Sequence, residues 1–221
     1  MSVIRVVLVD DEALVRSGFQ LILSAADDIE VVDAVDGMEA TESIRRHTPD
    51  VVLLDIRMPG RSGLDVLKDI REMSDPPVVA VLTTFDSDDY IARALREGAS
   101  GFLVKDTDPE QLPTLIRSLA AGGIVLSPHV SRTVIDGYLG AEDRASSALI
   151  DTLTNREQQV LARLANGDSN SEIGASLHLS VGTVKDHVSA ILSKLGVSSR
   201  LQAALIAERG GFTDGVPGAP R

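Results

Sequence analysis

Short apolar runs alternate with amphipathic segments over the first 121 residues of the chain. The runs are rich in β-branched residues, as expected of strands buried on both faces. They are Ile4–Val9, Val31–Val35, Val51–Leu54, Val78–Leu82 and Phe102–Val104. The segments between them have the helical period, and in the first of these segments Leu14, Gly18, Leu21, Ile22 and Ala25 share one face. This alternation predicts an α/β doubly wound parallel sheet of five strands, in which function resides where the carboxyl ends of the strands meet.

The pattern changes after this first domain, which we predict to span residues 3–121. Residues 122–150 mix Gly, Ser, Pro and charges, and we interpret them as a linker. Residues 151–209 are typical of a small all-α domain with four helices. These are Asn155–Ala165, Asn170–His178, Val181–Leu195 and Ser199–Ala207. The short second helix and the tight turn after it predict a helix-turn-helix. Residues 210–221 are expected to form a disordered tail.

The composition limits the class of protein. A chain of 221 residues is long enough for two domains with separate cores. It has no Cys, which excludes disulfides and thiolate metal sites. Charges within the first twelve residues interrupt any signal-peptide core, and no apolar run approaches the roughly 18 residues of a membrane helix. We therefore expect a soluble cytoplasmic protein without membrane contacts.

The net charge of −12 is unevenly distributed along the chain. Residues 1–125 hold 23 acidic residues and 12 Lys or Arg, whereas residues 126–221 hold 10 and 9. Two domains with different partners would produce such a division. The total argues against non-specific binding of nucleic acid by the chain as a whole.

Polar residues with related chemistry stand at the carboxyl ends of four predicted strands. They are Asp10 and Asp11, Asp55, Thr83 and Lys105. Any one of them has a simpler explanation, because such an Asp is commonly a solvated turn residue or a helix cap. Together they indicate a function: clustered carboxylates repel unless a hard cation such as Mg²⁺ joins them. With a lysine and a hydroxyl, this set suits holding a phosphoryl group on a carboxylate.

The segments VVLVDDE, VVLLDIRMPGRSGLDVL, AVLTTFD and GASGFLVKD resemble the CheY-like receiver domain of two-component response regulators, over roughly residues 3–121. The resemblance implies that Asp55 accepts a phosphoryl group from a histidine kinase. It also implies that Asp11, Asp55 and the backbone carbonyl of Arg57 hold Mg²⁺, while Asp10 binds through water.

The same resemblance implies a switch. Lys105 would pair with a phosphoryl oxygen, and Thr83 would move inward to hydrogen-bond the phosphoryl group. The aromatic switch position falls on Phe102, which has no hydroxyl, so coupling there would depend on packing. The surface of the fourth helix, fifth strand and fifth helix would then shift, allowing dimerisation or release of the second domain.

The helix Val181–Leu195 has an apolar stripe opposite a face of small polar residues bordered by lysines. Taken alone, this pattern slightly favours an ordinary helix of a small bundle over a helix that enters the major groove. However, the segments LTNRE and SNSEIGASLHLSVGTVKDHVSAILSKLGV resemble the LuxR-type DNA-binding domain, and both domains together resemble the NarL/FixJ branch of response regulators.

On this pattern Thr183 and Lys185 would contact DNA, with His187 and Lys194 near phosphates. Gly174 stands where the family usually has alanine, which costs about 1 kcal/mol of helix stability. Residues 151–209 carry six acidic residues and six Lys or Arg, so two half-sites bound by a homodimer would have to reinforce each other. Asp186 would either accept from a cytosine amino group or repel phosphate.

The sequence therefore predicts a non-enzymatic, phosphorylation-controlled transcription regulator that uses Mg²⁺ and binds DNA. One alternative is a regulator that acts largely independently of phosphate. Another is a phosphohydrolase that forms an aspartyl-phosphate, although such enzymes usually place a second acid where this chain has Arg57.

Overall fold

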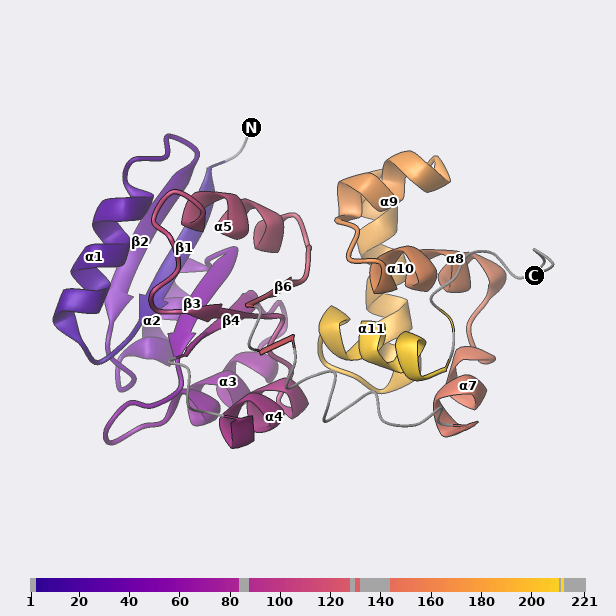
Figure 1. Ribbon diagram of the computed structural model, residues 1–221, viewed down its shortest axis with the longest axis horizontal. Helices are drawn as coiled ribbons and strands as arrows, with labels where there is room; N and C mark the ends of the chain where they lie inside the picture. Colours follow the sequence, from indigo (N-terminus) through magenta and orange to yellow (C-terminus); the bar gives the residue numbers. More distant parts are fainter. Residues whose placement is uncertain (1–2, 84–87, 128–129, 132–143, 211, 213–221) are drawn as a thin grey trace. The chain divides into compact units, whose positions relative to one another are not determined.

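The structure is a computed structural model that describes residues 3–83, 88–127, 130–131, 144–210 and 212 (Figure 1). It divides into two compact units. One comprises Met1–Ala120 and Val125–Val130, and we call it the sheet unit. The other comprises Ala121–Ile124 and Ser131–Arg221, and we call it the helical unit.

The sheet unit contains a parallel sheet in the order β2-β1-β3-β4-β5-β6. The strands are β1 (Ile4–Val9), β2 (Ile29–Val35), β3 (Val51–Asp55), β4 (Val78–Thr83), β5 (Gly101–Val104) and β6 (Val125–Leu126). The predicted doubly wound parallel sheet is confirmed, with β6 as a two-residue addition beside β5. This strand forms inside the segment that we interpreted as a linker.

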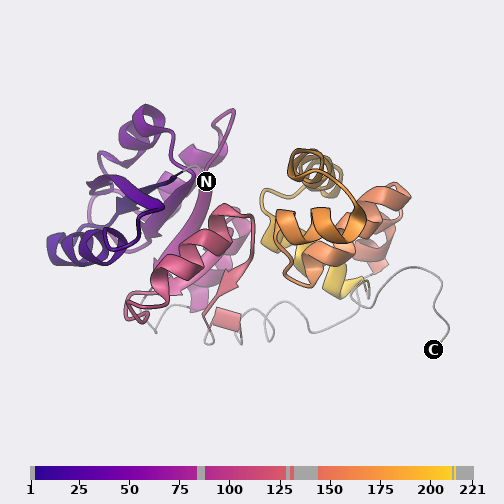
Figure 2. The same cartoon turned by 90° about the horizontal axis from the view of Figure 1, so that it is seen from above.

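Five helices connect these strands and lie on both faces of the sheet (Figures 1 and 2). They are α1 (Ala13–Leu23), α2 (Ala40–His47), α3 (Gly63–Arg71), α4 (Asp88–Arg96) and α5 (Leu112–Ala120). Helix α1 packs beside α5, and α3 packs beside both α2 and α4. Alternate strand residues such as Leu8, Leu53 and Leu103 form one core with α1 and α5. Phe102 is fully buried outside this core, because neighbouring strand residues point to opposite faces.

Only part of the apolar face that the sequence suggested for α1 is buried, because Ile22 packs against the core while Leu14 and Leu21 do not. Phe19 and Leu23 pack into the core, whereas Leu14 is 88% exposed and Leu21 is 75% exposed. Gly18 lies between these two leucines, and a Cβ atom added there would have no neighbour within 4 Å. The helix thus has apolar residues on two sides, and only one of them covers the sheet.

The helical unit is built from α7 (Arg144–Ile150), α8 (Asn155–Ala165), α9 (Asn170–Leu177), α10 (Val181–Leu195) and α11 (Arg200–Arg209). The four predicted helices correspond to α8–α11, and α7 lies within the predicted linker. Thr154, Ser169 and Ser199 start three of them with capping boxes, which satisfy backbone N–H groups that helix starts leave unpaired. Apart from Gly210 and Phe212, the predicted tail lies outside the described residues.

The turn between α9 and α10 is short, and Gly174 explains how it closes. His178 adopts a left-handed conformation with φ of 55° and ends α9. Leu179 then returns to hydrogen-bond the carbonyl of Gly174 at 2.9 Å. A Cβ atom at residue 174 would lie 2.8 Å from the carbonyl oxygen of Leu179. The glycine therefore allows the turn as well as lowering helix propensity. Among the described helices, none is long and apolar enough to cross a membrane.

Candidate functional site

The five polar residues singled out from the sequence meet at the carboxyl edge of the sheet. Asp55 is the last residue of β3 and Thr83 is the last residue of β4, while Asp10 and Lys105 directly follow β1 and β5. Residues Val51–Leu54 of β3 are fully buried, so the strand holds its final carboxylate at a fixed position. Parallel strands that end at one edge bring these groups together from distant parts of the chain.

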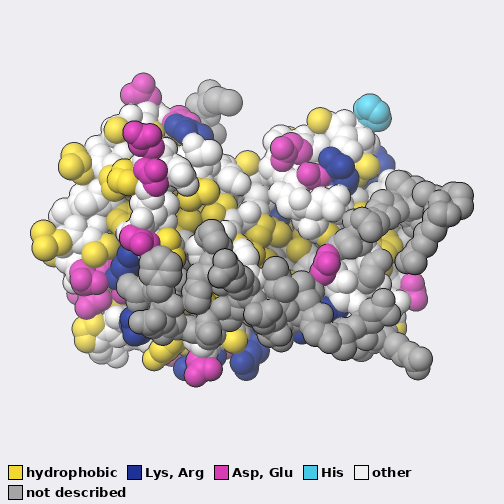
Figure 3. All heavy atoms as spheres, viewed as in Figure 1, with side chains coloured by type: hydrophobic (Ala, Val, Ile, Leu, Met, Phe, Trp, Pro, Cys, Tyr) yellow, Lys and Arg dark blue, Asp and Glu magenta, His cyan; other side chains and the backbone are white. Residues whose placement is uncertain are grey.

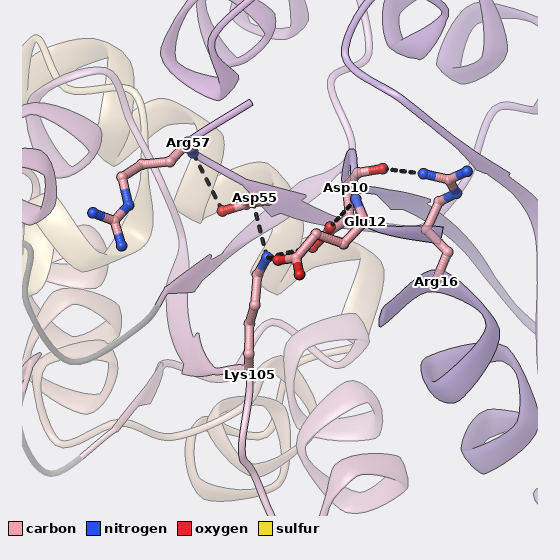
Figure 4. A network of polar contacts seen from close by, with 6 residues as sticks. All are labelled: Asp10, Glu12, Arg16, Asp55, Arg57 and Lys105. Carbon is pink, nitrogen blue, oxygen red and sulfur yellow. Dashed lines mark hydrogen bonds and ion pairs between the residues drawn. The ribbon is translucent and has the colours of Figure 1, made fainter. Parts of the chain in front are cut away.

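Lys105 lies at the centre of this site (Figure 4). Its Nζ atom is 2.8 Å from Asp10 Oδ2, 3.0 Å from Asp55 Oδ2 and 3.0 Å from Glu12 Oε1. Asp10 and Asp55 are almost completely buried, whereas Glu12 is largely exposed. One ammonium group is therefore shared by three carboxylates, two of which are shielded from water.

Burial and hydrogen bonding shift the pKa values of this cluster in opposite directions. Burial raises the pKa of Asp10, although hydrogen bonds from Lys105 and from the backbone N–H of Glu12 counteract it. Burial by itself would lower the pKa of Lys105, but hydrogen bonds to Asp10, Asp55 and Glu12 outweigh it and raise that pKa above its usual value. Lys105 is therefore a permanent cation beside Asp55 at any physiological pH.

Three of the acids also have the geometry of a cation site. Carboxylate oxygens of Asp10, Asp11 and Asp55 all lie within 4.8 Å of one another. A hard divalent cation such as Mg²⁺ is bound by oxygen ligands of this kind and retains several waters. The backbone of Arg57 is adjacent, because its N–H donates to Asp55 Oδ1 at 3.3 Å, while its side chain points away (Figure 4). The donor set therefore fits the predicted magnesium ion.

Gly63 fixes the backbone that carries Asp55, a role that is not among those predicted from the sequence. A Cβ atom at Gly63 would overlap the carbonyl oxygen of Asp55 and lie 2.8 Å from Ile56 Cα. The N–H of Gly63 donates to the carbonyl of Ile56 at 3.0 Å, and Ser62 caps the start of α3. The only available signal was a Ser-Gly pair directly before an apolar helical period.

Two contacts link the site to the start of α1. Glu12, which precedes α1, pairs with Lys105, and Arg16 Nη1 donates to the carbonyl oxygen of Asp10. The carboxylate of Asp10 accepts from the N–H of Glu12 at 2.8 Å, so Asp10 shapes the turn instead of capping the helix. The first turn of α1 is therefore held by the same groups that surround Asp55.

Of the two predicted switch residues, Thr83 lies at this edge and Phe102 lies three residues before Lys105 on β5. Thr83 is buried, and its carbonyl oxygen accepts from the N–H of Lys105 at 3.0 Å. Phe102 is paired with Val81 in the sheet and is fully buried. Thr83 is thus paired in the sheet with Val104, the residue directly before Lys105, and Phe102 lies on the same strand as Val104.

In the helical unit, the predicted DNA-contacting residues belong to α10. Val184, Ile191 and Leu195 fix this helix in the core. Ser180 caps it by accepting from the N–H of Thr183 at 3.1 Å. Lys185 and Asp186 are exposed, while Thr183 and His187 are half-buried.

Lys194 is placed differently from Lys185. Its Nζ atom lies 2.6 Å and 2.8 Å from the two carboxylate oxygens of Glu157, a buried residue of α8. Glu157 also accepts from the N–H of Thr154 at 2.7 Å. The hydrogen bond from Lys194 is the main reason that the pKa of Glu157 falls to about 2. Lys194 therefore joins α10 to α8, whatever it contacts outside the protein.

Comparison with known proteins decides the family. The model of the "Response regulator receiver domain" matches residues 6–117, and that of "Bacterial regulatory proteins, luxR family" matches residues 151–207. The chain belongs to the response regulators. It is a two-component response regulator with a receiver domain and a LuxR-type DNA-binding domain, and thus a transcription regulator, not an enzyme.

Relatives of this response regulator match it over almost their whole length. The "Uncharacterized transcriptional regulatory protein YxjL" of Bacillus subtilis (strain 168) is 37% identical, with 95% of this chain and 97% of the relative covered. LiaR of the same organism, also a transcriptional regulatory protein, is 38% identical, with 93% of this chain and 97% of the relative covered. The crystal structure of the response regulator ChrA, from a heme-sensing two-component system, has 32% identity and a TM-score of 0.53, and the match covers 96% of this chain and all of that one.

Proposed function

We propose that Asp55 accepts a phosphoryl group from a sensor histidine kinase, and that the phosphorylated response regulator binds DNA as a homodimer in the cytoplasm. The observation that carries this proposal is the placement of Lys105. Its ammonium group lies 3.0 Å from Asp55 Oδ2, at an edge where three carboxylates converge. A lone structural ion pair would not require the other two acids.

The chemistry expected at Asp55 is a direct transfer. A carboxylate oxygen of Asp55 attacks the phosphorus atom of a phosphohistidine, and the P–O bond forms as the P–N bond breaks. The imidazole leaves with the electron pair of that bond and takes a proton from solvent. Lys105 stabilises the charge on the transferred oxygens, and the Thr83 hydroxyl donates to one of them. Asp10, Asp11, Asp55 and the backbone carbonyl of Arg57 would hold Mg²⁺, which would supply positive charge to offset the negative charge of the phosphoryl oxygens.

Phosphorylation then changes which groups Lys105 binds. The phosphoryl group adds nearly two negative charges and three acceptor oxygens beside an ammonium already shared by three acids. Thr83 and Phe102 are the residues through which we expect this change to reach the surface, by a shift of population between two packings.

DNA recognition is assigned to α10. Thr183 and Lys185 stand on its first two turns, where recognition helices contact base edges, with His187 and Lys194 nearer the phosphates. The balanced charge of residues 151–209 limits the attraction of one copy to DNA. Two copies on two half-sites would overcome that limit.

The phosphorylation step is tested by incubating the protein with Mg²⁺ and a small phosphodonor and measuring the intact mass. Wild type should gain one phosphoryl group, and Asp55→Asn should gain none. Asp27→Asn, which changes an exposed carboxylate outside the site, is the matched control and should behave as wild type. Labelling of Asp55→Asn would refute the assignment of the acceptor.

The DNA step is tested by mobility shift on genomic fragments with and without the phosphodonor. Tighter binding after phosphorylation supports the proposal. Equal binding under both conditions would instead favour a regulator that ignores phosphate, and phosphate release from small substrates without any DNA binding would favour a phosphohydrolase.

The two lysines of α10 separate DNA contact from folding. Lys185→Gln should weaken DNA binding without lowering the melting temperature, because Lys185 is exposed. Lys194→Gln should lower the melting temperature, because it leaves the buried Glu157 without its cation. If Lys194 also contacts phosphate, its loss reduces the salt dependence of binding by about one unit of slope.

A further inference from the structure

The loop that joins β3 to α3 carries the backbone of Arg57, which borders the acidic site. We call residues 56–62 the acid-site loop. At its base, the N–H of Gly63 donates to the carbonyl of Ile56 at 3.0 Å. Ile56 and Met58 are buried, while Arg57 between them is exposed. The part of the loop that contains Arg57 is therefore anchored in the protein on either side.

The other end of the acid-site loop is held by the side chain of Arg61. Its Nη2 atom donates to Thr41 Oγ1 of α2 at 2.9 Å and pairs with Asp69 Oδ2 of α3. The hydroxyl of Thr41 also donates to Asp69 Oδ2 at 3.3 Å. Gly37 leaves room for this arrangement, because a Cβ atom there would lie 2.7 Å from the carbonyl oxygen of Arg61. Three side chains, from the loop and from two helices, thus form one cluster.

Partial burial makes this cluster a firm restraint. Thr41 is buried, and the side chains of Arg61 and Asp69 are 25% and 40% exposed. Water therefore screens their ion pair less than it screens a pair on the open surface. Arg46, for comparison, pairs with Glu42 on α2, and these side chains are 64% and 71% exposed. Arg61 thus restrains the loop, whereas the contact of Arg46 is a weak surface pair.

From these contacts we propose that Arg61 is a positioning residue for Mg²⁺. By tying the acid-site loop to Thr41 and Asp69, it keeps the backbone carbonyl of Arg57 in place at the site. This inference rests on the proposed function for the assignment of that carbonyl to Mg²⁺. A magnesium site demands near-ideal octahedral geometry, so a ligand on a loop that drifts is bound less well. Groups that orient a metal ligand without touching the metal accordingly contribute to metal affinity.

Charge and position predict opposite effects of removing Arg61. Residues 1–125 hold 23 acidic residues and 12 Lys or Arg, and acidic side chains are visible over the surface of the sheet unit (Figure 3). Loss of one positive charge from this unit would, through Coulomb interactions alone, strengthen the binding of a divalent cation. Loss of a restraint on the loop would weaken it. Weaker binding without Arg61 therefore identifies position as its role.

The test is calorimetric titration of the full chain with Mg²⁺. Arg61→Met keeps most of the length of the side chain but none of its donors. It should weaken Mg²⁺ binding by about three- to tenfold, less than the roughly 10- to 100-fold that follows loss of a direct partner of a metal ligand. Arg61→Lys, which retains a cation for Asp69, should recover much of the affinity. Arg46→Met removes the same charge from the surface pair on α2, so it is the matched control and should bind Mg²⁺ at least as tightly as wild type.

The Mg²⁺ dependence of phosphorylation separates this role from a general loosening of the fold. In Arg61→Met, the Mg²⁺ concentration that half-saturates the rate with a small phosphodonor should rise by the same factor, and excess Mg²⁺ should recover most of the rate. A loss of rate that excess Mg²⁺ did not recover would overturn the inference. The double variant Arg61→Met, Asp69→Asn should bind Mg²⁺ no more weakly than Arg61→Met, because both changes break one contact.

Unchanged or tighter binding of Mg²⁺ by Arg61→Met would also overturn the inference, and so would a wild-type protein that bound no Mg²⁺. Failure of the proposed function has a different signature. Wild type would then bind Mg²⁺ in the titration yet take up no phosphoryl group, while Arg61→Met would still bind Mg²⁺ more weakly. The two failures are thus distinguishable.

Discussion

Gly63 occupies a position that leaves no room for a side chain. A Cβ atom at residue 63 would overlap the carbonyl of Asp55. This carbonyl is part of the backbone and cannot swing away as a flexible side chain would. The residue therefore sets how closely α3 approaches the end of β3, and with it the position of the Asp55 carboxylate.

We predict that Gly63→Ala lowers the free energy of unfolding by roughly 1–3 kcal/mol, as expected when a core is overpacked. It should also slow phosphorylation, because the backbone of Asp55 must move. Urea denaturation and the rate of mass gain measure the two effects. Gly18→Ala is the control and should be more stable than wild type by about 1 kcal/mol. A Gly63→Ala protein as stable as wild type would contradict this account.

Lys105 balances the charge of the acids around it, so its removal should make the fold dependent on a cation. We predict that Lys105→Gln lowers the melting temperature in the presence of a chelator, because Asp10 and Asp55 then repel each other without compensation. Mg²⁺ should raise the melting temperature of this variant more than that of wild type. Equal responses to Mg²⁺ would mean that the acids do not hold the ion.

The convergence of Asp10, Asp55, Thr83 and Lys105 could be predicted from the sequence, because parallel strands end at the same edge. The role of Glu12 could not be predicted. Its contact with Lys105 joins residues 93 positions apart and depends on the reach of two flexible side chains. The requirement for glycine at residue 63 was likewise hidden, since it depends on the angle at which α3 meets β3.

Among the helices and strands, those with strong periodicity were predicted almost to their ends, such as β1, α8 and α10. Elements of few residues, β6 and α7, were missed because so short a segment has no detectable period. Periodicity also failed to identify the buried side of α1. It indicates that an apolar stripe exists, but tertiary packing decides which of two apolar sides covers the sheet.

The pair formed by Lys194 and Glu157 joins α10 to α8, and it gives the helical unit a defined response to acid. The pKa of Glu157 is 4.5 when unperturbed and falls to about 2 in the fold, chiefly because Lys194 binds it. A lowered pKa means that this pair contributes its full stability above pH 4.5 and loses it as the pH falls toward 2.

We predict that Glu157→Gln is less stable than wild type at neutral pH, and that the difference shrinks as the pH is lowered from 4.5 toward 2. Thermal unfolding of both proteins across this range measures the effect. The variant Glu172→Gln, which changes a fully exposed capping-box glutamate, controls for loss of a carboxylate without a lysine partner. A difference that stayed constant with pH would contradict the role of Lys194.

At the scale of the whole molecule, the charge of −12 is concentrated in the domain that receives the signal, while the domain that binds DNA is nearly neutral. The two activities of the protein should therefore depend on salt in opposite ways. Self-association brings acidic surfaces together and should strengthen as salt screens them. DNA binding releases counterions and should weaken.

We predict that a higher salt concentration increases dimer formation of the phosphorylated protein and decreases its affinity for DNA. A suitable range is about 50 to 200 mM, over which counterion release is commonly measured. Sedimentation and mobility shift on the same sample measure both. If dimer formation fell together with DNA affinity as the salt concentration rose, charge repulsion would not oppose dimer formation.

The open space around Gly18 has a consequence for how this protein tolerates mutation. Alanine there would make the single chain more resistant to heat, since it removes a flexible residue from the middle of a helix and strains nothing. A laboratory selection for thermostability would enrich that change early. The resulting proteins would unfold at a higher temperature, and no neighbouring atom within 4 Å would have to move to admit the new methyl group.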